Sequence, residues 1–130
     1  NCEACREAVI AQEHATADSV AVIPNGVDLT RFRDLPQEPA ELTGRYGRRV
    51  GVVANLRDVK GLDLFIRAAA MLASRHEGLE FLIAGEGELR SSLESLINEL
   101  GVHHRVKLVG EVVDVPAFLH GLDIAVLSSR

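Results

Sequence analysis

The hydrophobic residues of this chain gather in short unbroken runs that alternate with stretches of helical spacing. The runs at 50–54, 81–84, 106–109 and 124–127, in which Lys107 is the only charged residue, predict four strands. Between the first three runs, apolar residues recur three and four positions apart, which is the period of a helix with one buried face. The two predicted helices are marked by Leu62, Phe65, Ile66, Ala69, Leu72 and Ala73, and by Leu89, Leu93, Leu96, Ile97 and Leu100.

The order of these elements predicts an α/β fold with a parallel sheet. Strands that are apolar at every position belong to sheets that helices cover on both faces. Crossover connections between parallel strands produce the observed alternation of strand and helix along the chain. Asp114, with Pro116 two residues later, predicts the start of a short third helix before the fourth strand. In such folds, ligands bind at the carboxyl ends of the strands.

The first third of the chain has a different pattern. Residues 1–18 have helical spacing and few large apolar side chains, so they predict a helix that is polar on one side. The run at 20–23 predicts a short strand, and the Pro-Asn-Gly that follows it predicts a turn. The stretch 35–47 contains two prolines that interrupt any periodicity, and we interpret it as a connection.

Charge and composition exclude several classes of function. The chain has 130 residues, enough for one domain with its own core, and a formal net charge of −5. Because basic residues are not clustered and only 4% of residues are aromatic, we expect no nucleic acid partner. No run of about 18 apolar residues occurs, so we expect a soluble, cytoplasmic protein.

Cys2 and Cys5 form a C-x-x-C motif, which is typical of half a zinc site or of a redox pair. Zinc needs two further ligands, and a redox motif of the thioredoxin type should follow a strand, whereas this motif opens a stretch of helical spacing. We therefore interpret both cysteines as ordinary helix residues. The adjacent His103 and His104 are interpreted as part of a solvated turn, so no metal site is predicted.

The loop at 55–61, with the sequence NLRDVKG, is a candidate anion site. It joins the first predicted strand to its helix and presents Asn55, Arg57 and Lys60 ahead of Gly61. The unpaired N–H groups and the dipole of a helix N-terminus attract anions. Cations there are unfavourable unless an anion offsets them, which favours a bound phosphate over the alternative of two solvated surface charges.

The GEGE loop at 85–88 lies at the same predicted edge of the sheet. Gly85 and Gly87 allow the loop to approach a ligand closely, and a plain strand-to-helix turn is the alternative. A dinucleotide-binding fingerprint needs a third glycine three residues later, and that position is Arg90, so an NAD site is not favoured.

The loop at 110–114, with the sequence GEVVD, is the third loop at this edge. Capping of a helix is the expected role of Asp114, while backbone groups of Glu111 and Val112 are candidates to face a ligand. No set of nucleophile, base and orienting acid is visible in the sequence, so a hydrolase is not predicted.

Five stretches, taken in order, resemble one known family. The chain is similar to the donor-binding domain of the retaining glycosyltransferases of group GT4, which have the two-domain GT-B architecture. The resemblance implies a Rossmann-like parallel sheet with crossover helices. It also implies that residues 1–18 are the tail of the N-terminal acceptor domain, 19–47 an interdomain linker and lead-in segment, and 48–130 the first part of the C-terminal domain, truncated at its end. The five stretches are VIPNGVDLTRF, ANLRDVKGLDLFIRAAAML, EFLIAGEGELRSSLE, LGVHHRVKLVGEVVDVPAFL and DIAVLSSR.

The resemblance implies transfer of a sugar from a nucleoside diphosphate donor, a UDP or GDP sugar first of all, with retention and without a metal or other cofactor. The family's diphosphate contact carries over to Lys60 and Gly61. In the family, an arginine binds the phosphates together with this lysine. The corresponding position here is Asn55, so either Asn55 or Arg57 is expected to bind the phosphates with Lys60. Lys60 and Arg57 are the candidates for stabilising the leaving diphosphate.

Two other loops acquire roles by the same resemblance. Gly85 and Gly87 match the family's turn near the donor, and Glu111 and Val112 match the loop whose backbone meets the base.

The family's pair of donor-binding glutamates would follow Arg130, and the acceptor domain would precede the chain. We therefore expect a fragment with half a donor site and no activity of its own. The acceptor, whether glycan, lipid or small molecule, is left open. So is peripheral association with the inner face of a membrane through the N-terminal domain. The alternative from another class is a non-catalytic nucleotide- or phosphate-binding domain of doubly wound type.

Overall fold

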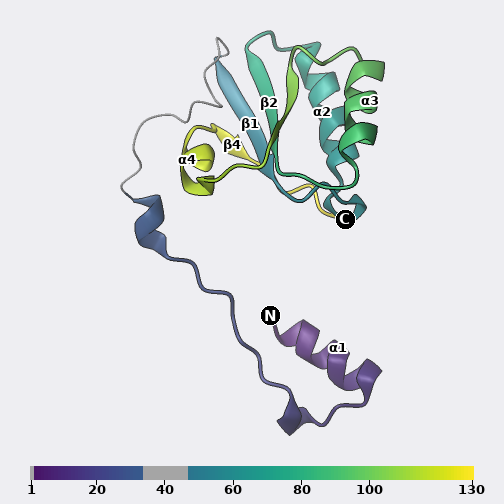
Figure 1. The fold of residues 1–130 in the computed structure, drawn as a ribbon, viewed down its shortest axis with the longest axis vertical. Coiled ribbons are helices and arrows are strands. Elements are labelled where there is room, and N and C mark those ends of the chain that lie inside the picture. Colours follow the sequence, from purple (N-terminus) through teal and green to yellow (C-terminus); the bar gives the residue numbers. More distant parts are fainter. Residues whose placement is uncertain (1, 34–46) are drawn as a thin grey trace. The chain divides into compact units, whose positions relative to one another are not determined.

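The computed structural model describes residues 2–33 and 47–130, and the chain divides into two compact units, 1–33 and 34–130 (Figure 1). The connection predicted at 35–47 falls outside the described residues except for Gly47. In the described part of the chain, no helix is both long enough and apolar enough to cross a membrane.

The first unit contains α1 (Glu3–Glu13) and two short 3-10 helices, η1 (Ala17–Ser19) and η2 (Leu29–Phe32). The helix predicted over 1–18 is therefore present but ends earlier. It ends where the chain adopts a left-handed conformation at His14, with φ at 55°.

The strand predicted over 20–23 is wrong, because residues 20–28 have no regular secondary structure. A strand needs a neighbour that pairs with its backbone N–H and C=O groups, and the one sheet in the described residues is built from later parts of the chain. The carbonyl of Val20 instead accepts a hydrogen bond from Arg6 Nε at 2.9 Å. An apolar run alone does not supply a pairing partner.

The second unit contains the predicted parallel sheet. Its strands are β1 (Arg48–Val53), β2 (Leu79–Ala84), β3 (Val106–Gly110) and β4 (Ile124–Ala125), in the spatial order β3-β2-β1-β4. All neighbouring strands are parallel, which confirms the predicted fold class. β4 is shorter than the predicted 124–127, since only two of its residues pair with β1.

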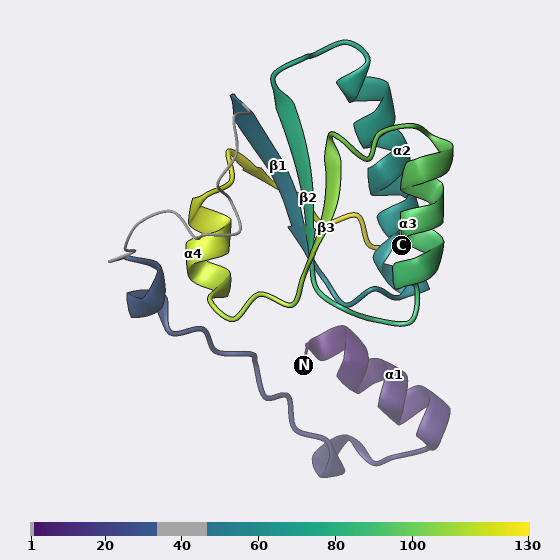
Figure 2. The same cartoon turned by 45° about the horizontal axis from the view of Figure 1, so that its top comes forward.

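Helices cover both faces of this sheet (Figures 1 and 2). α2 (Leu62–Ala73) and α3 (Arg90–Glu99) pack on one face, and α4 (Val115–His120) lies on the other. Each face has its own core. The core under α2 and α3 is centred on Val52, Leu56, Leu62, Phe65, Ile66, Phe81, Ile83, Leu93 and Val106, and the core under α4 on Leu82, Ala84 and Phe118.

A charged group lies buried near the amino end of β2. Glu80 is 2% exposed and alternates along β2 with Leu82 and Ala84, so it lies on the α4 face. Its carboxylate accepts a hydrogen bond from Lys107 Nζ on β3 at 2.6 Å and lies 3.4 Å from Arg49 Nε on β1. A buried carboxylate requires such partners, so these charges join three neighbouring strands.

The strand order creates a switch point. From β1 the chain proceeds to β2 and β3 on one side, then crosses to place β4 on the other side of β1. Asp123 fixes this return, because its N–H donates to the Arg49 carbonyl at 2.9 Å and its carboxylate accepts from the Arg49 N–H at 2.7 Å. Ligands of doubly wound folds bind at the carboxyl edge beside such a point.

Candidate functional site

The loop between β1 and α2 is built around a buried leucine. Leu56 is 0% exposed and belongs to the core under α2 and α3. Its N–H donates to the Glu86 carbonyl at 3.0 Å, and its carbonyl accepts from the Leu89 N–H at 3.1 Å. Leu56 was not among the residues selected from the sequence, although a single leucine inside a polar loop is a signal for such an anchor. The first two site loops are thereby joined to each other and to the core.

Gly85 is required by the close approach of these loops. Its φ is 136°, and a Cβ at this position would lie 2.1 Å from the Ala54 carbonyl oxygen. Its N–H donates to the Gly110 carbonyl at 2.7 Å, which joins the second loop to the third. Gly87 also lies close to the backbone of the loop between β1 and α2, because a Cβ there would be 2.7 Å from the Leu56 carbonyl oxygen. The GEGE loop therefore makes room for its neighbouring loop.

A pocket of about 330 Å³ lies at the carboxyl ends of β1, β2 and β3, within the size range of ligand sites. Its apolar wall is formed by Val53, Ala54 and Ala84 at the strand ends. Its lining also includes five of the residues selected from the sequence: Asn55, Lys60, Gly85, Glu111 and Val112. All three predicted loops thus meet at one pocket.

The remaining selected residues lie close by in the chain. Arg57 is exposed and forms the N-cap of η4 (Asp58–Lys60), a 3-10 turn between β1 and α2. Gly61 follows this turn with φ at 58° and is buried. The charges at this helix start are more balanced than predicted, because Asp63 lies in the first turn of α2 and Asp58 opens η4. The protein itself therefore supplies part of the negative charge that the sequence analysis assigned to a ligand.

One structural role predicted from the sequence is confirmed. Asp114 caps α4, since its carboxylate accepts from the Ala117 N–H at 3.0 Å. Arg90, where a dinucleotide fingerprint would have glycine, forms ion pairs with Glu86 and Glu94 at 2.5 and 3.0 Å. Within 2–33 and 47–130, no group of three or more His, Cys, Asp and Glu side chains could hold a metal ion.

A larger hollow of about 720 Å³ lies elsewhere, beside residues 47–48 and 75–79. These residues are at the amino ends of β1 and β2, the edge opposite to the one where doubly wound folds bind ligands. We therefore place the candidate site at the smaller pocket, where the three loops converge.

The parallel sheet, its switch point and the loops at its carboxyl edge define a ligand-binding domain of the doubly wound class. Comparison with known proteins identifies the family within that class. Residues 43–130 match the family described as glycosyl transferases group 1, and the chain belongs to this family. The matched region corresponds to part of the C-terminal domain of enzymes with the GT-B fold.

Individual relatives agree with this assignment. The chain is 32% identical over 112 residues to the phosphatidylinositol N-acetylglucosaminyltransferase GPI3 subunit of Saccharomyces cerevisiae, covering 83% of this chain and 24% of the relative. It is 34% identical over 120 residues to the GDP-mannose-dependent alpha-(1-6)-phosphatidylinositol monomannoside mannosyltransferase of Mycobacterium tuberculosis, covering 88% and 31%. The chain thus spans about a quarter to a third of these relatives.

A solved structure shows the same fold. The crystal structure of Anabaena Alr3699/HepE in complex with UDP and glucose superposes with a TM-score of 0.79 at 24% sequence identity. The match covers 99% of this chain and 36% of that one.

Proposed function

We propose that the full-length protein is a retaining glycosyltransferase that takes its sugar from a nucleoside diphosphate donor. The observation that carries the proposal is the pocket in which Lys60 meets the loops after β2 and β3. Membership of a glycosyltransferase family favours this function over the alternative of a non-catalytic nucleotide-binding domain. One relative is named for GDP-mannose and one solved neighbour was crystallised with UDP, so UDP and GDP sugars are the first donors to test.

In this proposal different residues of the pocket bind different parts of the donor. Lys60 donates to the diphosphate and stabilises the charge that develops on the leaving group when the bond to the sugar breaks. Asn55 or Arg57 is its partner on the phosphates. Gly61 and the glycines of the second loop keep backbone close to the donor, and backbone groups of Glu111 and Val112 meet the base. Every one of these contacts is made by a loop at the carboxyl edge.

The test is titration of the full-length protein with UDP, GDP and ADP, and with their sugars, by calorimetry. A charge-assisted hydrogen bond to a diphosphate predicts that Lys60→Ala weakens binding by about ten- to a hundredfold. Arg67→Ala removes an exposed charge of the same sign from α2, outside the pocket, and should leave affinity unchanged. Unchanged affinity in Lys60→Ala would refute the phosphate role. Asn55→Ala and Arg57→Ala, measured beside it, identify the partner by the larger loss.

The isolated chain of 130 residues should transfer no sugar, because it spans only about a quarter to a third of the glycosyltransferases it matches. Turnover by the purified chain would contradict this. Both curated relatives named above are named for phosphatidylinositol compounds, so a lipid acceptor at a membrane surface is the first acceptor to test with the full-length protein.

A further inference from the structure

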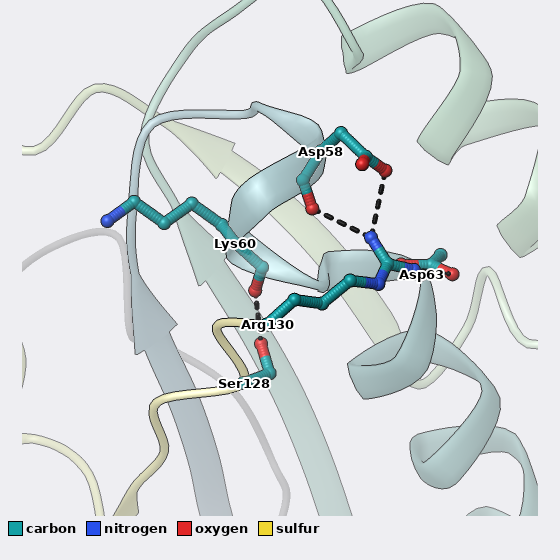
Figure 3. Close-up of polar contacts among 5 residues, drawn as sticks. All are labelled: Asp58, Lys60, Asp63, Ser128 and Arg130. Atoms are coloured by element: carbon teal, nitrogen blue, oxygen red, sulfur yellow. Dashed lines mark hydrogen bonds and ion pairs between the residues drawn. The ribbon is translucent and has the colours of Figure 1, made fainter. Parts of the chain in front are cut away.

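Residues 126–130, which we call the strap, run from β4 to the turn that carries Lys60 (Figure 3). The Arg130 N–H donates to the Val59 carbonyl at 2.9 Å. The Ser128 hydroxyl donates to the Lys60 carbonyl at 2.8 Å. The strap therefore binds the backbone of the 3-10 turn on its carbonyl side.

The Arg130 side chain adds a second set of contacts. One of its terminal nitrogens donates to both the carbonyl and the carboxylate of Asp58, and the other donates to both carboxylate oxygens of Asp63, all at 2.8 Å. Asp58 belongs to η4 and Asp63 to α2. The planar guanidinium thus joins the turn to the helix and pairs with two carboxylates at once.

Gly61, between the turn and the helix, is shaped to this arrangement. Its φ of 58° is one that side chains rarely adopt, and a Cβ there would lie 2.2 Å from the Ser128 carbonyl oxygen. The strap therefore lies directly against the junction of η4 and α2, and glycine leaves the space for it.

The Lys60 side chain points the other way. In Figure 3 it extends away from Arg130 and the two aspartates, and Lys60 is among the residues that line the 330 Å³ pocket. We propose that Ser128 and Arg130 are positioning residues that hold the Lys60 turn in place for a donor diphosphate. Arg130 also neutralises Asp58 and Asp63, whose charges oppose a bound anion. This inference rests on the proposed function of the pocket.

Two measurements on the full-length protein test the strap. Without nucleotide, Arg130→Gln should speed hydrogen exchange at the Lys60 and Gly61 amides by about tenfold, because the turn loses its support. With UDP or GDP as the probe, affinity should fall by about three- to tenfold. Ser128→Ala removes one hydrogen bond and should shift both readouts in the same direction by less. Arg67→Gln, which removes an exposed charge from α2, should change neither.

Arg130→Lys tests whether Arg130 acts through the geometry of its guanidinium group or only through its charge. Lysine keeps the charge but cannot bridge Asp58 and Asp63 as a planar fork does, so it should restore only part of the affinity. Full restoration would show that charge alone matters and would overturn the positioning role.

Lys60→Ala, measured in parallel, separates this inference from the proposed function. If Lys60→Ala leaves nucleotide binding unchanged, the phosphate role and the positioning role both fall. If Lys60→Ala weakens binding while Arg130→Gln leaves exchange or affinity unchanged, the positioning role is overturned and the proposed function stands.

Discussion

Truncation of Leu56 tests whether the site loop is part of the hydrophobic core. The side chain is 0% exposed and packs in the cluster that contains Leu62 and Ile66. Leu56→Ala removes three buried carbons at about 0.8 kcal/mol each and leaves a cavity, so the free energy of unfolding should fall by about 2 to 5 kcal/mol.

Urea unfolding of the 130-residue chain measures this loss. With a denaturant slope of about 1.5 kcal/mol per M, the unfolding midpoint should fall by on the order of 2 M. Leu64→Ala is the matched control, since Leu64 lies on α2 and is 51% exposed. Its effect should stay within about 0.5 kcal/mol. Equal shifts in the two variants would refute the reasoning, because they would mean that Leu56 is no more buried in solution than a surface leucine.

Three further predictions concern stability and reactivity. Gly87→Ala should lower the unfolding midpoint and weaken UDP or GDP binding in the full-length protein, because the added Cβ meets loop backbone at 2.7 Å; a variant with parent-like midpoint and affinity would contradict it. Glu80→Ala should cost about 3 kcal/mol in thermal unfolding because it breaks the buried pairs with Arg49 and Lys107, whereas Glu94→Ala, which breaks an exposed pair with Arg90, should cost under about 1 kcal/mol; equal costs would count against the buried pairs. Hydrogen bonding to Cys5, first of all from its backbone N–H, holds the pKa of Cys2 below its ordinary value, so alkylation of Cys2 by iodoacetamide should reach half its maximal rate at a lower pH than in an unstructured cysteine peptide; peptide mapping that finds the same or a higher midpoint would refute it.

The sheet was predictable because its signals are local. Continuous apolar runs identify strands buried on both faces, and Asp114 with Pro116 identifies the start of α4 from neighbouring residues alone. The extent of pairing was not predictable in this way. The run at 20–23 is as apolar as a strand but pairs with no strand among residues 2–33 and 47–130, and β4 stops at Ala125 because pairing with β1 stops there.

The site shows the same division. Asn55, Lys60, Gly85, Glu111 and Val112 could be selected because parallel strands bring the loops after them to one edge. The residues that support these loops could not be selected from the sequence, because their partners lie far away in the chain. Nothing in the sequence indicates that Arg130 reaches an aspartate 72 residues earlier, or that Leu56 turns into the core.

The strap has a consequence for the order in which the site is assembled during synthesis. The Ser128 hydroxyl and the Lys60 carbonyl that it bonds are 68 residues apart, and β4 pairs with the earliest strand of the sheet. A chain emerging from the ribosome can pair β1 with β2 and then β3 in the order of translation, whereas the strap contacts wait for residues 126–130 and for closure of a long loop. The turn that carries Lys60 is therefore translated early but fixed late, so a nascent chain that has not reached Ser128 contains the pocket residues without the contacts that hold them.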